Sequence, residues 1–556
     1  GGVSVIKDNG SVVDITNSGD TGYQVVGVVD FIGTSEIIFG MDASKGARAI
    51  RVHDIPLADV SVGANWYLKG TSKRFYKGYV ISTAPDLYIL GENSTVKKFM
   101  LDGVIGSNKG LSVLDENTST PSEGSVAYIA SDYNTGWMNG DIKLATLSDT
   151  STTNAAGAEL VDFSASSDWT ISSSSEGSHS FSSGVLTVTN NDTSDPPAYV
   201  YQAITTVSGK KYVLTATAAS GSSLPNFALI ASVNTATGGT INNTGSSTWN
   251  VAGTVATNTF TATSATTYVL LRVNANSAGT CKIASCSARL AEEDRSVNGN
   301  GLQVFGTVTK TAVATGADLV AYSGFDSSNY LKQPYNSDLD FGTGDFSFSV
   351  WFKGTDTYGV FAGTNTTFGK GFMIGVSGNT TSSRYLIRLA NFDLGNLNNN
   401  ARIISDQWTQ LVVSRKSGLV STYENGILIH SAAHSGTTDG NITEGGSLAV
   451  GYRQHDNNQN YQGKLALLRI SATVPTAEQI AKIYNDEKHL FATNAKATLY
   501  GSSNAVTALA YDDDTELLHA GTSAGRSVFQ GLNRVEYSTD AVTTAISASN
   551  GFIVEE

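Results

Sequence analysis

The chain has 556 residues and a formal net charge of −14, from 35 Lys or Arg and 49 Asp or Glu. Only 15% of its residues are charged, against about 25% in an average soluble protein, while 40% hydrophobic residues are enough for packed cores and exclude wholesale disorder. The sequence has no Lys/Arg cluster and no run of about 18 apolar residues, which excludes a basic nucleic-acid-binding surface and insertion into a membrane by an apolar helix.

Ser, Thr, Asn and Gly take the place of the missing charge, and they favour turns and strand edges over long helices. Short runs of Val, Ile, Leu, Tyr, Phe and Thr alternate with polar turn clusters about every ten residues. This pattern predicts an all-β protein, and the length predicts about three or four domains. The chain begins Gly1-Gly2-Val3 without a Met or a signal peptide, so we interpret it as a processed chain or a fragment.

The two ends of the chain share a short pattern: an acidic residue, several mostly apolar residues, then a Gly. It occurs at Glu36–Gly40, Asp86–Gly91 and Glu516–Gly521. The first two copies are spaced roughly as propeller blades are, and residues 504–530 read as strand, Asp turn, strand, Gly turn and strand. This last segment resembles the blades of bacterial sensor-type propellers. We therefore expect one propeller-like domain made of residues 1–154 and 492–556, interrupted by two inserted jelly rolls.

Residues 155–295 form the first predicted insert. Trp169, the Tyr-Val-Tyr-Gln run at 199–202 and the Gly-Lys-Lys-Tyr run at 209–212 lie in successive β-rich segments. This order resembles the jelly-roll carbohydrate-binding modules. Tyr199 and Tyr201 share one face of their strand and are candidates for a sugar-binding platform, although packing in a core explains such a face equally well.

The resemblance to these modules also implies weak calcium candidates, Glu159 and Asp162, and no other cofactor is expected. Cys281 and Cys286 lack the two further ligands that a zinc site needs. If residues 282–285 belong to one strand, the two thiols lie too far apart along it to form a disulfide. We expect both thiols to be buried and free.

Residues 296–324 are predicted to be a linker with a first strand, and residues 325–491 the second insert. The run 339–352 alternates between apolar and polar residues over most of its length, as a half-buried strand does. Asn425-Gly426 lies between two apolar runs, which is the strongest short signal for a β-hairpin.

The second insert closes with a predicted helix, in which the cap Thr476 precedes a hydrophobic stripe extending to Tyr484. A Gly-x-Leu strand at 463–465 comes before it. In this order, the alternating strands, the Asn-Gly hairpin, the Gly-x-Leu strand and the short helix resemble the laminin-G-like, concanavalin-A-like jelly roll.

The loop between Tyr452 and Tyr461 is dense in hydrogen-bonding side chains and has an aromatic residue at each end. Amide, acid and Arg groups bridge sugar hydroxyls, and an aromatic face packs against the C–H surface of a sugar. A solvated inter-strand loop is the alternative interpretation. The glycan-binding candidates in this loop are Tyr452, Arg453, His455, Asp456, Asn457, Asn460 and Tyr461.

We predict no catalytic residues. The run Gly521–Gly525 matches the Gly-x-Ser-x-Gly nucleophile elbow, but a β-rich segment and no His follow it, which favours a turn between strands. Glucanases of the concanavalin-A-like fold resemble one another in a Glu-x-Asp-x-Glu strand, which this chain lacks. We interpret Asp512–Asp514 as a solvated hairpin turn in preference to a calcium site.

Residues 124–149 are similar to stretches of virion structural proteins of marine tailed bacteriophages, where a propeller-like region is joined to inserted jelly rolls. The resemblance implies a non-enzymatic tail-fibre or other surface protein of an extracellular particle, whose jelly rolls bind host-surface glycans. The expected partners are other virion proteins, further copies of this chain and the glycan, with no nucleic acid. Two alternatives stay open: a capsid or tail decoration protein that binds no sugar, and a polysaccharide depolymerase.

Overall fold

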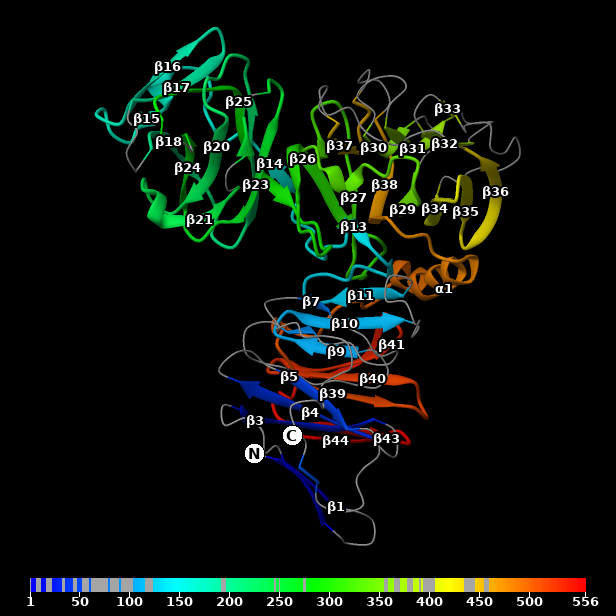
Figure 1. Ribbon diagram of the computed structural model, residues 1–556. Coiled ribbons are helices and arrows are strands. Elements are labelled where there is room, and N and C mark those ends of the chain that lie inside the picture. The colour runs from blue at the N-terminus through cyan, green and yellow to red at the C-terminus, as the bar shows by residue number, and fades with distance from the viewer. Residues whose placement is uncertain are drawn as a thin grey trace. The chain divides into compact units, whose positions relative to one another are not determined.

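A computed structural model of the chain divides into two compact units, residues 1–140 with 486–556 and residues 141–485 (Figure 1). Of residues 2–91 it describes only the backbone of eight strands. Beyond them it describes residues 104–115 and 124–556, apart from 192–196, 245–246, 250, 274–276, 355–358, 365–370, 378–383, 390–391, 394–405, 435–445 and 455–459.

The strands of residues 2–91 form small sheets in the first unit. They are β1 (Gly2–Ile6), β2 (Val12–Thr16) and β6 (Val60–Ser61); β3 (Tyr23–Ile32), β4 (Glu36–Ala43) and β5 (Arg48–Val52); and β7 (Tyr79–Val80) with β8 (Leu90–Gly91). The acidic–apolar–Gly run at Glu36–Gly40 lies in β4. The run at Asp86–Gly91 falls outside the described residues except for its last two.

Two four-stranded antiparallel meanders belong to the same unit. One consists of β9 (Val104–Ser107), β10 (Gly110–Asp115), β11 (Ser125–Ile129) and β12 (Met138–Asn139), and the other of β39 (Val506–Asp512), β40 (Leu517–Thr522), β41 (Gly525–Gln530) and β42 (Asn533–Ser538); the hairpin β43 (Ile546–Ser549) and β44 (Phe552–Glu555) follows. Each meander has the strand number and order of one propeller blade. A propeller-like arrangement of the whole unit stays a prediction.

Buried polar side chains join the two ends of the chain within the first unit. The amide nitrogen Nδ2 of Asn134 donates to the carbonyls of Ala497 and Leu532 at 2.9 and 3.2 Å. Its Oδ1 accepts the backbone N–H of Gly136 at 2.9 Å, and the backbone N–H of Trp137 donates to Glu487 Oε1 at 2.7 Å. Because Asn134 is fully buried, each of these bonds replaces a contact with water that folding removes.

The second unit contains two β-sandwiches, and residues 158–292 form the first of them. One of its sheets has the order β15 (Thr170–Ile171), β18 (Tyr199–Thr205), β24 (Thr266–Val273), β20 (Asn226–Ser232) and β21 (Thr240–Asn243), with β22 (Ser247–Thr248) also beside β20. The other has the order β16 (Gly177–Ser182), β17 (Val185–Asn190), β25 (Gly279–Glu292), β19 (Lys211–Ala218) and β23 (Val255–Thr261).

The core of the first sandwich lies between these two sheets and includes alternate residues of both. Trp249 is fully buried and stacks on Phe227, with ring centroids 4.2 Å apart. Both cysteines lie in β25, where they are buried and free, as the sequence predicts. Burial raises the pKa of Cys281 to about 12 and raises that of Cys286 even further.

We expect the native protein not to react with a thiol reagent such as dithionitrobenzoate at mildly alkaline pH. The thiolate is the reactive form, and the raised pKa of both thiols leaves almost none of it in the folded state. After unfolding in urea, both cysteines of each chain should react. Rapid labelling of the folded protein would contradict the burial of β25.

The second sandwich packs two larger sheets face to face. One has the order β36 (Ile427–Ala433), β35 (Leu419–Glu424), β34 (Thr409–Lys416), β29 (Phe346–Lys353), β38 (Lys464–Ser471) and β13 (Ile142–Thr146), and β27 (Val320–Ser323) also pairs with β38. The other has the order β33 (Phe392–Asp393), β32 (Arg384–Leu389), β31 (Phe372–Ser377), β30 (Gly359–Gly363), β37 (Leu448–Val450), β28 (Tyr330–Gln333) and β26 (Leu302–Ala312), to which β14 (Ala155–Gly157) is added.

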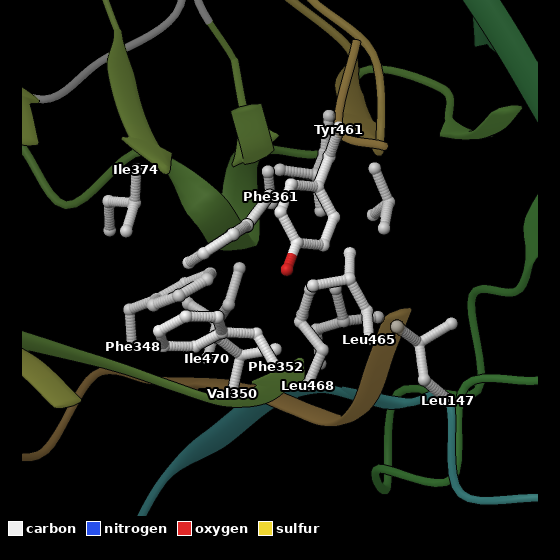
Figure 2. Close-up of a cluster of buried hydrophobic side chains, with 14 of the residues drawn as sticks. Leu147, Phe348, Val350, Phe352, Phe361, Ile374, Tyr461, Leu465, Leu468 and Ile470 are labelled. Carbon is white, nitrogen blue, oxygen red and sulfur yellow. The ribbon is translucent and has the colours of Figure 1, made fainter. Parts of the chain in front are cut away.

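Aromatic and branched aliphatic side chains fill the space between these sheets (Figure 2). Phe352, Phe361 and Tyr461 meet at its centre, with ring centroids 4.8 Å apart for the first pair and 4.7 Å for the second. Leu147 lies in the same core although it precedes the first sandwich in sequence. The second sandwich is therefore completed by chain from both sides of the first.

This arrangement changes the expected boundaries. The strand Ile142–Thr146, which we assigned to the first domain, pairs with β38 more than 300 residues away. Residues 302–312, expected to belong to a linker with a first strand, form the long strand β26, which pairs with β25, β27 and β28. Strand neighbours of this kind depend on pairing between distant segments, which local periodicity does not report.

Two local predictions for the second sandwich are confirmed. Asn425 and Gly426 form the two-residue turn between β35 and β36, both with positive φ as a type I′ turn requires. The helix α1 (Ala477–Glu487) begins after Thr476, whose hydroxyl accepts the backbone N–H of Gln479 at 3.2 Å while the Gln479 side chain accepts the N–H of Thr476 at 2.9 Å. No helix among the described residues has both the length and the apolar character needed to span a membrane.

Candidate functional site

A cluster of tyrosines lies on the outer face of the β15–β18–β24–β20–β21 sheet, opposite the core. We call Tyr199, Tyr201 and Tyr268 the tyrosine platform. Tyr201 lies between the other two, with ring centroids 6.4 Å from Tyr199 and 6.3 Å from Tyr268. All three rings are half-buried. They pack against Ala228, Ile230 and Leu270, which are fully buried although they belong to the outer face.

Strand register explains why these residues meet. Tyr201 lies opposite Leu270 on β24, and Leu270 lies opposite Ile230 on β20. Tyr199 is paired in the same way with Arg272, and Ala203 with Tyr268. Since side chains alternate between the two faces of a strand, β18 and β24 place the tyrosines on one surface and Val200, Val269 and Leu271 in the core.

Polar groups surround the platform. The Tyr199 hydroxyl donates to the carbonyl of Thr235 at 2.9 Å, which fixes the position of its ring. Burial, the Glu176 carboxylate and Tyr201 raise the pKa of Tyr199, so its hydroxyl stays protonated and able to donate at neutral pH. Arg272 lies directly opposite Tyr199 on β24, so its side chain leaves the sheet on the same face. The surface thus combines aromatic rings with hydrogen-bonding groups.

The structure brings Tyr199 and Tyr201 together as expected, and adds Tyr268 and Arg272, which sequence reasoning missed. Their signal was present in the strand 266–273, where Tyr268, Leu270 and Arg272 alternate with apolar residues. What the sequence did not show is that this strand lies next to β18.

A second aromatic row lies on the outer face of the second sandwich. Phe305, Tyr330 and Tyr452 stack in order, with ring centroids 4.5 and 4.3 Å apart. The guanidinium of Arg289 covers the free face of Phe305 at 4.2 Å. We call these four residues the aromatic ladder. The two inner rings, Phe305 and Tyr330, are each covered on both faces by their neighbours, and Tyr452 forms the end of the ladder.

The other residues of the 452–461 loop differ in their positions. Arg453 is only 8% exposed and Tyr461 only 1%, and the Tyr461 ring packs edge-on against Phe361 in the core. Tyr461 is therefore a core residue and is withdrawn as a glycan-binding candidate. Asn460 is half-buried. His455, Asp456 and Asn457 lie outside the described residues.

The two weak calcium candidates are engaged in other ways. Glu159 accepts hydrogen bonds from the backbone N–H of Ala288 at 2.8 Å and the Ser287 hydroxyl at 2.7 Å, and forms an ion pair with Arg289 at 3.2 Å. Asp162 is exposed, and its backbone exchanges hydrogen bonds with the Gln202 side chain. Across the described residues, no three His, Cys, Asp or Glu side chains come together as metal ligands.

Comparison with known proteins supports the fold predicted for the second sandwich. Residues 325–481 match the family model of the concanavalin A-like lectin/glucanases superfamily. The match confirms the laminin-G-like jelly roll in the second sandwich. No curated protein matches the chain.

Solved structures resemble parts of the chain. Domain 4 of AbnA, an extracellular arabinanase from Geobacillus stearothermophilus in complex with arabinotriose, is 18% identical over 34% of this chain and 92% of its own, with a TM-score of 0.27. A CBM4 structure is 17% identical over 24% and 94%, with a TM-score of 0.18. An arabinofuranosidase in complex with arabinofuranosyl-α-1,2-xylobiose is 13% identical over 59% and 72%, with a TM-score of 0.30. None of these likenesses identifies a ligand for this chain.

Lectins and glucanases share the concanavalin-A-like fold, and glycoside hydrolysis needs a pair of carboxyl groups that flank the scissile bond. The matched segment contains Glu424, which accepts a hydrogen bond from the buried Tyr385 hydroxyl at 2.6 Å. The Gly521–Gly525 run forms the tight turn between antiparallel strands β40 and β41, and Thr522 pairs with Gly525. A nucleophile elbow needs a strand followed by a helix, so Ser523 is not placed as a catalytic nucleophile.

Proposed function

We propose that this protein binds glycans through the tyrosine platform of its first sandwich and has no catalytic role. The observation that carries the proposal is the group of three half-exposed tyrosines on one sheet face, underlain by buried aliphatic side chains. Aromatic rings pack against the apolar C–H faces of sugars. The neighbouring Arg272 guanidinium and exposed Asn243 are suited to hydrogen bonding with hydroxyls.

The aromatic ladder supports a smaller contribution from the second sandwich. Tyr452 ends the ladder, is half-buried and begins the polar loop 452–461. The stacking on Tyr330 holds this ring in place, which reduces the entropy lost on binding. We assign Tyr452 a supporting role, together with the loop residues Arg453, His455, Asp456, Asn457 and Asn460.

The wider role that we propose is adsorption. As a tail-fibre or other surface protein of a virus particle, the chain would assemble with other virion proteins and with copies of itself outside the cell. Many weak contacts to a host-surface glycan would then combine into strong attachment, because multivalency raises the effective concentration of each site. The low content of charged residues fits binding that does not depend on electrostatic steering.

We expect Tyr201→Ala to weaken binding to host-surface polysaccharide by about tenfold or more, because it removes the central ring of the platform. Tyr201→Phe keeps the ring and should bind nearly as the unaltered chain does. Tyr537→Ala is the matched control, since Tyr537 is 55% exposed and belongs to the other unit. Glycan-array binding followed by calorimetry measures the change.

Three outcomes of this experiment count against the proposal. Equal binding by Tyr201→Ala and the unaltered chain would remove the platform as the site. No binding to any host polysaccharide would favour a decoration protein. Shortening of the polysaccharide on incubation would favour a depolymerase.

A further inference from the structure

Besides the tyrosine platform, the first sandwich has a recess at the edge where β21 and β23 lie near each other. It is a pocket of about 410 Å³ lined by residues of β19, β21 and β23 and by the 298–300 turn. Most of its lining side chains are Asn or Thr. The single aromatic residue, Phe260, is 3% exposed and stacks on Tyr212 in the core. The pocket therefore offers hydrogen-bonding groups and no aromatic platform.

The base of the pocket contains an unsatisfied hydrogen-bond acceptor. Asn258 is only 3% exposed, and its Nδ2 donates to the carbonyls of Leu229 at 2.9 Å and Asn242 at 3.1 Å. These bonds fix which way the amide points. Its Oδ1 is buried and has no hydrogen-bond partner among the described residues. Because this oxygen lies below the surface, a ligand cannot reach it. The exposed Thr257 and Thr261, on the same face of the sheet as Lys211, are the hydrogen-bonding groups within reach of a ligand.

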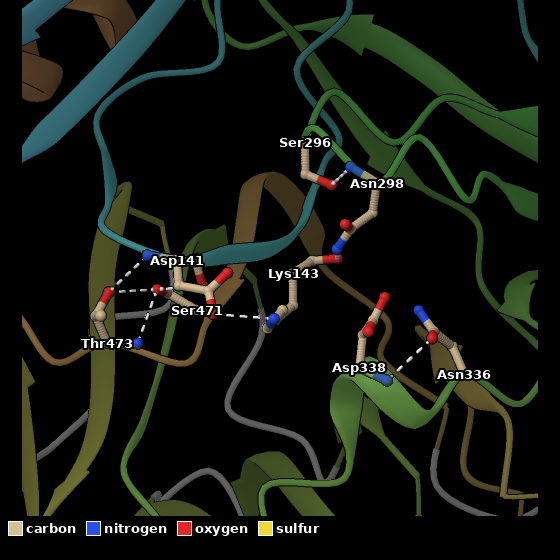
Figure 3. Close-up of polar contacts among 8 residues, drawn as sticks. All are labelled: Asp141, Lys143, Ser296, Asn298, Asn336, Asp338, Ser471 and Thr473. Atoms are coloured by element: carbon tan, nitrogen blue, oxygen red, sulfur yellow. Dashed lines mark hydrogen bonds and ion pairs between the residues drawn. The ribbon is translucent and has the colours of Figure 1, made fainter. Parts of the chain in front are cut away.

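The 296–300 turn forms a wall of the pocket and is held in place from below. The buried carboxylate of Asp294 accepts hydrogen bonds from the backbone N–H groups of Ser296 and Asn300 at 2.9 and 3.1 Å. It also accepts the Ser296 hydroxyl at 2.9 Å. Figure 3 shows Ser296 bonded to the backbone of Asn298, whose side chain reaches toward Lys143. A wall fixed in this way needs little ordering when a ligand binds.

The charge of the pocket points to the class of ligand. Lys211 is its only charged lining residue, and it has no ion-pair partner within the described part of the chain. A lysine ammonium donates to carboxylate oxygens, and such charge-assisted bonds are stronger than neutral ones. We infer that this pocket binds an acidic sugar residue, with its carboxylate on Lys211 and its hydroxyls on the exposed Thr257 and Thr261.

The pocket is a separate site from the tyrosine platform, and the inference does not rest on the proposed function of that surface. The two are nevertheless neighbours, because Asn243 of the pocket pairs with Ile230 in the row that runs through Leu270 to Tyr201. Three strand spacings separate Tyr201 from Asn243, which is about 14 Å. A single glycan chain could lie across the platform and end in the pocket.

The test uses the full chain and two small probes, methyl β-D-glucuronide and methyl β-D-glucoside, followed by ligand-observed NMR and calorimetry. The two probes differ only at C6, which is a carboxylate in the glucuronide and a hydroxymethyl group in the glucoside. We expect the glucuronide to bind in roughly the millimolar range, as its size allows, and the glucoside about tenfold more weakly. Equal binding of the two probes, or no binding of the glucuronide, would overturn the inference.

Variants then locate the binding. Lys211→Met should weaken glucuronide binding by about tenfold. The free energy of unfolding should change little, because the Lys211 side chain is partly exposed. Lys282→Met is the matched control, since it removes a lysine from another strand of the same sandwich outside the pocket. Tyr201→Ala should leave glucuronide binding unchanged even if it abolishes polysaccharide binding. An unaltered affinity in Lys211→Met would place the glucuronide elsewhere and overturn the inference.

Discussion

Replacing Lys310 with Met is expected to lower the free energy of unfolding of the second unit by about 3–5 kcal/mol at neutral pH, because it leaves buried acids without their cation. Lys310 is buried on β26 and forms an ion pair with Asp149. Its ammonium lies 5.3 Å from the centre of the Tyr322 ring, and the Tyr322 hydroxyl donates to Glu292 at 2.6 Å. Urea unfolding followed by tryptophan fluorescence measures the loss.

The effect of Lys310→Met should grow with pH. Burial raises the pKa of Glu292 above its ordinary value, while the nearby Lys310 opposes this rise. A carboxyl whose pKa is higher in the folded state than in the unfolded state contributes to stability at pH values below its unfolded-state pKa of about 4.3. This contribution to stability is lost as the pH rises through the folded-state pKa. Without Lys310 the pKa of Glu292 rises further, so the loss continues toward neutral pH.

Two further variants test this explanation. Adding Glu292→Gln to Lys310→Met should remove much of the pH dependence, because the amide oxygen still accepts the Tyr322 hydroxyl and carries no charge. Lys210→Met removes an exposed lysine and should leave stability nearly unchanged. A Lys310→Met protein that is equally destabilised at all pH values from about 4.3 to neutrality would contradict the role of the buried acids.

Trp249→Ala is expected to destabilise the first sandwich by about 3–5 kcal/mol. The ring is fully buried and stacks on Phe227, and its Nε1 donates to the carbonyl of Lys282 at 2.9 Å. Truncation therefore leaves a large cavity and an unpaired carbonyl on β25. Hydrogen exchange read by mass spectrometry should show faster exchange in peptides from residues 158–292.

The control for this variant is Trp408→Ala. Trp408 is half-buried in the second sandwich, where its Nε1 donates to the carbonyl of Val313 at 2.9 Å. Its loss should leave exchange in residues 158–292 unchanged. If Trp249→Ala accelerated exchange no more than Trp408→Ala did in those peptides, Trp249 would not be the centre of the first core.

Features that depend on a few neighbouring residues could be predicted from the sequence. The Asn425-Gly426 turn follows from the need for positive φ at both positions. The start of α1 follows from the reciprocal bonds of Thr476 and Gln479. The all-β class also follows from strand alternation and turn spacing. The concanavalin-A-like sandwich was predicted from the resemblance of residues 325–491 to that family, and the match over residues 325–481 supports it.

The candidate site could be predicted only in part. Alternation placed Tyr199 and Tyr201 on one face, and the composition of the 452–461 loop made Tyr461 a glycan-binding candidate. The structure adds Tyr268 to the first pair and places Tyr461 against Phe361 in the core. Alternation states which residues share a face of a strand, but the side that faces the core depends on the sheet that packs against it.

The sequence by itself determined the strands, their tight turns, the capped helix and the inert character of Cys281 and Cys286, because each depends on local backbone preferences or on composition. Only the tertiary structure decided which strands are neighbours. It paired Ile142–Thr146 with β38, placed Tyr268 beside Tyr201, and gathered Lys211, Asn258 and the 298–300 turn around one pocket. Such groupings arise from contacts between distant segments, and no single stretch of the chain encodes them.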